Sequence, residues 1–113
     1  MRSRLKRESL VDVLICDGDL NATRMVQLSH RMNRLIGQNH KNMLLDLGKA
    51  RCVDLAGLGI LIERLRKVRQ LRGDIRLCNV RPRVSETLRL IGINGLIESY
   101  DSKEAALESF QFA

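Results

Sequence analysis

Four aspartates, Asp17, Asp19, Asp46 and Asp54, lie where predicted strands end or where a predicted helix begins. Active sites of parallel sheets gather at the carboxyl ends of the strands, so these carboxylates are the first candidates for acid or base chemistry. No partner histidine, cysteine nucleophile or paired glutamate accompanies them, and aspartate is also a common turn former and helix cap. We therefore favour turn and cap roles, and we expect a binding protein that is not an enzyme and needs no cofactor.

The cysteines and histidines show no pattern of a disulfide framework or a metal site. Cys16, Cys52 and Cys78 are an odd number of widely spaced residues with apolar neighbours, which predicts buried, reduced thiols. His30 and His40 have no cysteine or carboxylate at a spacing that would hold a metal ion with them. We expect no metal centre.

The most distinctive local sequence is VDLAGLG at residues 53–59, at the start of a predicted helix. The N-terminus of a helix presents unpaired N–H groups and the positive end of the helix dipole, which favours an anion. The glycines Gly57 and Gly59 allow close approach of another backbone, and Asp54 is suited to cap the helix. The segment is neither GxGxxG nor a P-loop, since it lacks the lysine and the serine or threonine of the latter. Taken alone, the pattern favours a structural turn.

The elements that position these residues are short and regularly alternating. Hydrophobic patterns predict strands at residues 11–16, 43–47 and 75–80, with shorter ones at 5–9 and 96–100. Helices are expected to begin at Asn21 or Thr23, at Asp54, at Pro82, and at Asp101 or Ser102. Gly73 is expected as the left-handed residue that ends the second helix, and Gly92 stops the third.

The length predicts one domain that spans residues 1–113, and the alternation of strands and helices predicts that it is α/β. The chain has 113 residues, 44% hydrophobic and 29% charged, enough for one core, and its apolar runs are too short to cross a bilayer. The basic N-terminus is not followed by the long apolar segment of a secretory signal, which favours the cytoplasm. We predict a small mixed, mostly parallel sheet with helices packed mainly on one side.

The formal net charge of +7 leaves three kinds of partner open: nucleic acid, anionic lipid or an acidic protein. Aromatic residues make up only 3% of the chain, too few for a platform on which bases stack. Basic residues alternate with apolar ones in residues 63–72, a pattern typical of the solvated face of an amphipathic helix. We therefore expect no nucleic-acid partner.

Several segments together resemble one family. They are MLLDL (43–47), VDLAGLGIL (53–61), CNVRPRV (78–84), LIGI (90–93) and AAL (105–107). Over about residues 5–110 the chain resembles the STAS domain family of anti-sigma factor antagonists. The early DGDLN (17–21) is similar to the family's Gly-Glu-Leu-Asp turn, with Asn21 in place of its last acid.

The resemblance implies a module of a bacterial partner-switching system. In that family the unphosphorylated antagonist binds an anti-sigma factor, often a serine kinase related to the GHKL ATPases, and thereby frees a sigma factor. Phosphorylation of a serine in the family motif Asp-Ser-Ser-Gly-Leu-Gly ends the binding. The phosphorylated, second serine falls on Ala56 and the first on Leu55. No phosphorylation is expected at this position, so binding would be constitutive or controlled by synthesis or by competing partners.

The predicted partner-binding surface joins the early turn to the start of the second helix. Its residues are Asp19, Asn21, Asp54, Leu55, Ala56, Gly57, Leu58 and Gly59. Leu55 would supply an apolar contact, and Arg64, Arg66 and Lys67 would complement an acidic partner. Leu55 as a cover of the core and Ala56 as a plain helix former remain open alternatives.

A second function also fits the resemblance, namely a STAS-like scaffold or accessory subunit of a sensory or membrane transport complex. In that case the basic face would meet a neighbouring subunit or anionic lipid. A homodimer is compatible with both functions.

Overall fold

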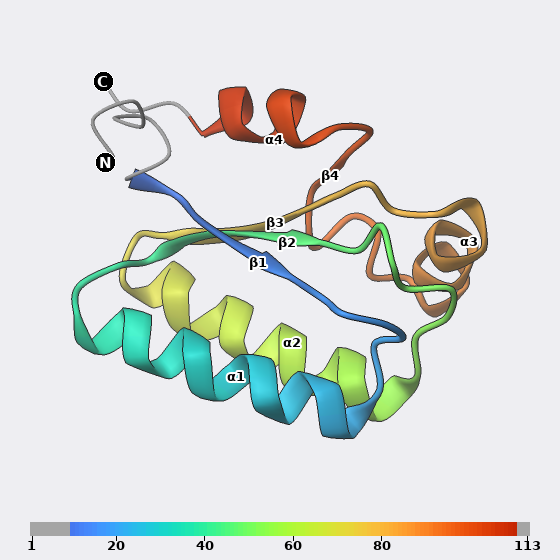
Figure 1. Cartoon of the computed structure of the whole chain (residues 1–113), viewed down its shortest axis with the longest axis horizontal. Coiled ribbons are helices and arrows are strands. Elements are labelled where there is room, and N and C mark those ends of the chain that lie inside the picture. Colours follow the sequence, from blue (N-terminus) through green and yellow to red (C-terminus); the bar gives the residue numbers. More distant parts are fainter. Residues whose placement is uncertain (1–9, 111–113) are drawn as a thin grey trace.

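The computed structural model describes residues 10–110, in which four strands alternate with four helices (Figure 1). The elements are β1 Asp12–Ile15, α1 Ala22–Gly37, β2 Asn42–Asp46, α2 Leu55–Gln70, β3 Asp74–Cys78, α3 Pro82–Ile91, β4 Ser99–Tyr100 and α4 Lys103–Ser109. The strand predicted at residues 5–9 lies outside the described residues. None of the helices within residues 10–110 is long and apolar enough to cross a membrane.

The described strands form one sheet in the order β1-β2-β3-β4, and every pair in it is parallel. Leu14, Leu45 and Leu77 lie side by side across β1, β2 and β3. Helices α1, α2 and α3 connect successive strands, as parallel pairing requires. The predicted small, mostly parallel sheet is confirmed, although the last strand is shorter than the predicted residues 96–100.

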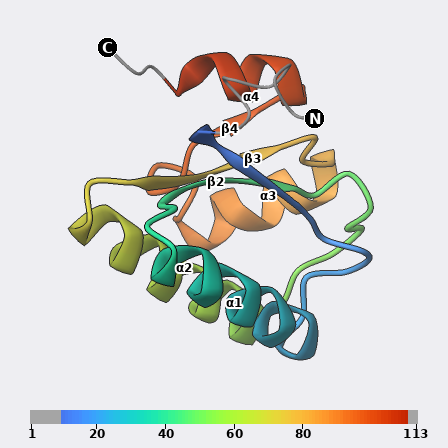
Figure 2. The ribbon, with the colours of Figure 1, turned by 60° about the vertical axis from the view of Figure 1, so that its left-hand side comes forward.

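Three helices cover one face of the sheet, and α4 alone covers the other (Figure 2). Successive residues of β2 alternate between these faces, with Leu45 in the core under α1, α2 and α3 and Leu44 in the core under α4. Burying one such leucine stabilises the fold by about 1.5–3 kcal/mol. The prediction of helices packed mainly on one side is therefore confirmed.

Polar side chains begin the helices at the predicted positions. The Asn21 side chain accepts a hydrogen bond from the Arg24 N–H at 2.8 Å, and Asp54 Oδ1 accepts one from the Gly57 N–H at 2.7 Å. Ser102 caps α4 in the same way. Of the alternatives left open by the sequence, Asn21 and Ser102 are the residues used.

Gly92 ends α3 in the left-handed conformation, with φ of 88°, as predicted. The prediction for Gly73 is wrong, because Arg72 takes the left-handed conformation at the end of α2, with φ of 69°. Gly73 follows it and donates its N–H to the Val68 carbonyl at 2.8 Å. A Cβ at position 73 would lie 2.0 Å from the Lys41 carbonyl oxygen, so close approach requires this glycine.

The three cysteines are free, but they do not share one environment. Cys16 and Cys78 are buried as predicted, and burial raises the pKa of the Cys78 thiol to about 11. Cys52 is exposed, which corrects the prediction that all three are buried, because it lies in the surface loop between β2 and α2.

Candidate functional site

Two loops far apart in the sequence meet beside the start of α2. Leu20 and Val53 form a parallel bridge that continues the pairing beyond the ends of β1 and β2. The Leu20 N–H donates to the Cys52 carbonyl at 3.0 Å, and the Asp54 N–H donates to the Leu20 carbonyl at 3.1 Å. The early turn and the start of α2, which the sequence assigns to one surface, are therefore adjacent.

The Asp19 carboxylate holds this pair of loops together. Its Oδ1 accepts hydrogen bonds from the backbone N–H groups of Arg51 at 2.8 Å and Cys52 at 3.2 Å. The hydrogen bond from Arg51, followed by those from Cys52, lowers the pKa of Asp19 from its ordinary value. Asp19 is thus an ionised turn former rather than a proton donor.

The other aspartates also act in local structure. Asp46 Oδ1 accepts from the Gly48 N–H at 2.9 Å and from the Asn79 side chain at 3.3 Å, and Asp17 forms an exposed ion pair with Lys49. Within residues 10–110, no group of three or more histidine, cysteine, aspartate or glutamate side chains could hold a metal ion. The turn and cap roles favoured by the sequence are confirmed for Asp19, Asp46 and Asp54.

The two glycines of the motif differ in their surroundings. Gly57 is buried, and a Cβ there would lie 2.8 Å from the Leu20 carbonyl oxygen and 3.0 Å from the Asn21 carbonyl carbon. Gly59 is exposed, and a Cβ there would meet no atom within 4 Å. The predicted close approach of another backbone is therefore confirmed for Gly57 alone.

The first turn of α2 presents an apolar residue to solvent. Leu55 is 70% exposed, and Ala56 beside it is also exposed. Leu58, one turn later, is only 3% exposed and belongs to the core. Leu55 therefore does not cover the core, which settles one alternative left open by the sequence.

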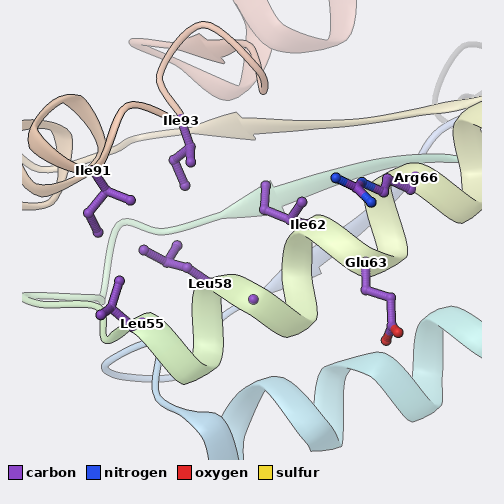
Figure 3. A pocket seen from close by; sticks show the side chains of 8 residues that line it. Leu55, Leu58, Ile62, Glu63, Arg66, Ile91 and Ile93 are labelled. Carbon is purple, nitrogen blue, oxygen red and sulfur yellow. The ribbon is translucent and has the colours of Figure 1, made fainter.

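An apolar groove extends from Leu55 along α2 towards the end of α3. Its volume is about 460 Å³, and it is lined by Leu55, Leu58, Gly59, Ile62, Glu63, Arg66, Ile91 and Ile93. Figure 3 shows the apolar side chains of α2 on one side, Ile91 and Ile93 across from them, and the charged residues Glu63 and Arg66 farther along the helix, with their side chains pointing in different directions. Sequence reasoning did not assign Ile91 and Ile93 to this surface. An apolar residue directly after the helix-ending Gly92 is the signal that could have found Ile93.

The basic residues of α2 do not form one exposed face. Arg64 has a side chain only 16% exposed, donates a hydrogen bond to Asn33 of α1 and lies 3.3 Å from the Glu63 carboxylate. Arg64 therefore connects α2 to α1, and its predicted contact with an acidic partner stays a prediction. Arg66 and Lys67 are exposed, and Arg66 lines the groove.

Most of the chain matches the model of one family of known proteins. The model of the STAS domain matches residues 4–106 of the chain. The chain belongs to the STAS domain family. Leu55 and Ala56, on which the resemblance places the two family serines, are exposed residues of the first turn of α2.

Among curated relatives, this STAS domain is similar to a Bordetella bronchiseptica protein named "Putative anti-sigma factor antagonist BtrV". The two are 27% identical over 96 residues, or 85% of this chain and 83% of BtrV. The crystal structure of a Thermotoga maritima protein described as a "putative anti-sigma factor antagonist" has a TM-score of 0.81 at 19% identity, covering 88% of this chain and 86% of that one. The STAS domain of the Vibrio cholerae SulP transporter has a TM-score of 0.72 at 20% identity, covering 88% and 79%. These two structures share the fold.

Proposed function

We propose that this STAS domain is an anti-sigma factor antagonist of a bacterial partner-switching system and that phosphorylation at position 56 does not control it. The similarity to BtrV supports the class of protein. The proposed partner is an anti-sigma factor or a GHKL-type serine kinase, bound in the cytoplasm by a module without enzymatic activity.

The exposed Leu55 is the observation that carries this proposal. It stands at the mouth of an apolar groove, beside the position of the family's phosphorylated serine. A leucine that becomes buried on binding contributes about 1.5–3 kcal/mol, enough to act as a central contact of an interface. Gly57 and Leu58, which are buried, would shape this surface from below, while Asp54, Ala56 and Gly59 lie on it.

The absence of a hydroxyl at position 56 supports constitutive binding. A phosphoryl group would add about −1.5 to −2 charges at pH 7. Asp54 lies two residues before position 56, and its N–H is bonded to the carbonyl of Leu20, the residue after the ionised Asp19, so that an added negative charge would meet an acidic surface and disturb a docked partner. Ala56 cannot accept the group. Synthesis of the protein or competition between partners would then set how much partner is bound.

Affinity capture from the native bacterial lysate, followed by mass spectrometry, tests the proposal. The variant Leu55→Asp is compared with Leu90→Asp, since Leu90 is 71% exposed but does not line the groove. We expect capture of an anti-sigma factor by the wild type and by Leu90→Asp, and its loss with Leu55→Asp. Equal capture by both folded variants would contradict the assigned surface.

A second candidate function is that of a scaffold or accessory subunit of a sensory or membrane transport complex. The likeness in fold to the STAS domain of the Vibrio cholerae SulP transporter favours it. Capture of transporter or sensory subunits, with no anti-sigma factor, would support this function and contradict the first. A homodimer would show as a doubled mass in light scattering of the purified chain.

A further inference from the structure

A second concave surface lies at the end of the domain opposite to Leu55. Figure 1 shows the loops that join α1 to β2 and α2 to β3 at one end of the sheet, and the starts of α1 and α2 at the other. The pocket beside these two loops has a volume of about 410 Å³ and is lined by Lys41, Asn42, Arg69, Arg72, Gly73, Asp74, Arg76 and Phe110. We call it the basic pocket, because four of its residues are cationic and one is anionic.

Asp74 organises one side of the basic pocket. Its side chain is 15% exposed and accepts from Arg69 Nε at 3.0 Å and from Arg76 Nε at 2.9 Å. Arg76 also donates to the Ser109 carbonyl at 2.6 Å, and its guanidinium lies 4.5 Å from the centre of the Phe110 ring. Arg76 is therefore held in place by the fold, with little freedom to follow a ligand.

The remaining cations are not neutralised. Among residues 10–110, neither the Lys41 ammonium nor the Arg72 guanidinium has a hydrogen-bond or ion-pair partner, and the hydrogen bond of Arg69 uses only Nε. The carboxylates of Asp74 and of Glu98, which lies 3.7 Å from Arg76 Nε, balance two of the four positive charges and leave a local excess of two. Arg72 also keeps a left-handed backbone, where glycine or asparagine is usual.

Stabilisation of the α2 dipole explains only part of this arrangement. Basic residues in the last turn of a helix interact favourably with its negative end, which accounts for Arg69. Lys41 belongs to the loop after α1, and Arg72 lies beyond the end of α2. Their convergence on one pocket results from the adjacency of β2 and β3, which brings the backbones of Lys41 and Gly73 together.

We propose that the basic pocket binds a small molecule that carries one or more phosphate groups. Arginine and lysine are the side chains that recognise phosphate, the first through its planar fork and the second as a point charge. The concave shape and the volume fit a small ligand, whereas duplex DNA would require an extended basic surface. This site is separate from the proposed partner-binding surface.

Titration with inorganic pyrophosphate, followed through backbone amide resonances by NMR, tests the proposal. We compare the double variant Lys41→Gln/Arg72→Gly with the control Lys49→Gln/Arg83→Gln, which removes the same charge from the opposite end of the sheet. Glycine at position 72 accepts the left-handed backbone, so this variant is expected to fold. Lys49 and Arg83 are both exposed.

We expect saturable shifts at residues 39–42 and 69–76, and a loss of affinity of about 10-fold in the first double variant, from the loss of two ion contacts at a solvent-accessible site. The control should bind as the wild type does. Equal weakening in both variants, or shifts spread over all basic residues, would overturn the proposal. Parallel measurements with phosphatidylserine vesicles and with duplex DNA distinguish other sources of phosphate. The proposal would also be overturned if pyrophosphate did not saturate the pocket while the vesicles or the DNA bound in a way that depends on Lys41 and Arg72.

Discussion

The two glycines at the start of α2 should respond in opposite directions to the same substitution. Gly57→Ala places a Cβ 2.8 Å from the Leu20 carbonyl oxygen and 3.1 Å from that of Asn21, and both atoms are backbone. Gly59→Ala places a Cβ in open space on the same helix. The pair therefore separates the effect of crowding from that of helix propensity.

The magnitudes follow from these distances. Alanine is favoured over glycine in a helix by up to about 1 kcal/mol, and this gain applies to both positions. Overpacking against a backbone costs about 1–3 kcal/mol, and this cost applies only to Gly57. We expect Gly57→Ala to lower the free energy of unfolding by up to about 2 kcal/mol and Gly59→Ala to raise it by about 0.5–1 kcal/mol.

Urea denaturation followed by far-UV circular dichroism measures both changes, provided that the slope against denaturant stays constant among the variants. Amide resonances of residues 17–21 should move in Gly57→Ala and remain in place in Gly59→Ala, because only the former displaces the early turn. If both variants gained stability equally, the packing of α2 against residues 20–21 would be refuted.

The remaining predictions concern side chains around the same loops. Asp54→Ala removes the cap of α2 and should lower the free energy of unfolding by about 1 kcal/mol in urea titrations, whereas an unchanged value would contradict the cap. The pKa of Asp19 is lowered in the folded protein, so its stabilising effect is present above its unfolded pKa and is lost as the pH falls through the folded pKa. Stability measured from neutral to acidic pH should therefore fall less steeply for Asp19→Asn than for the wild type, and parallel curves would oppose this assignment. Cys52 should react first with a maleimide on the native protein, because Cys16 and Cys78 are buried, and mass spectrometry of the labelled peptides would reveal any other order.

Much of the fold follows from local signals. The predicted strand at residues 43–47 corresponds to β2 Asn42–Asp46, and the predicted caps Asn21 and Asp54 are those observed. Such signals depend on contacts within a few residues, such as the bond between Asp54 and the Gly57 N–H. The reason for a glycine at position 73 could not be predicted in this way, because the Lys41 carbonyl that a Cβ there would meet is distant in the sequence.

Part of the candidate site could likewise be predicted from the sequence, and part of it could not. Its position at the start of α2 could be predicted from the motif at residues 53–59 and from the resemblance to the STAS family. The environment of Arg64 could not, because its contact with Asn33 depends on how α1 packs against α2. The same holds for the exposed Cys52, whose burial was inferred from apolar neighbours in the sequence.

By itself, the sequence determined the alternation of strands and helices, the residues that cap the helices and the absence of a hydroxyl at position 56. Residue types, and the spacing of neighbours along the chain, are sufficient for each of these. Only the tertiary structure decided that Leu55 faces solvent beside a groove and that Lys41 and Arg72 share a pocket. Exposure and proximity depend on the order and register of parallel strands, which bring together residues that are far apart in the sequence.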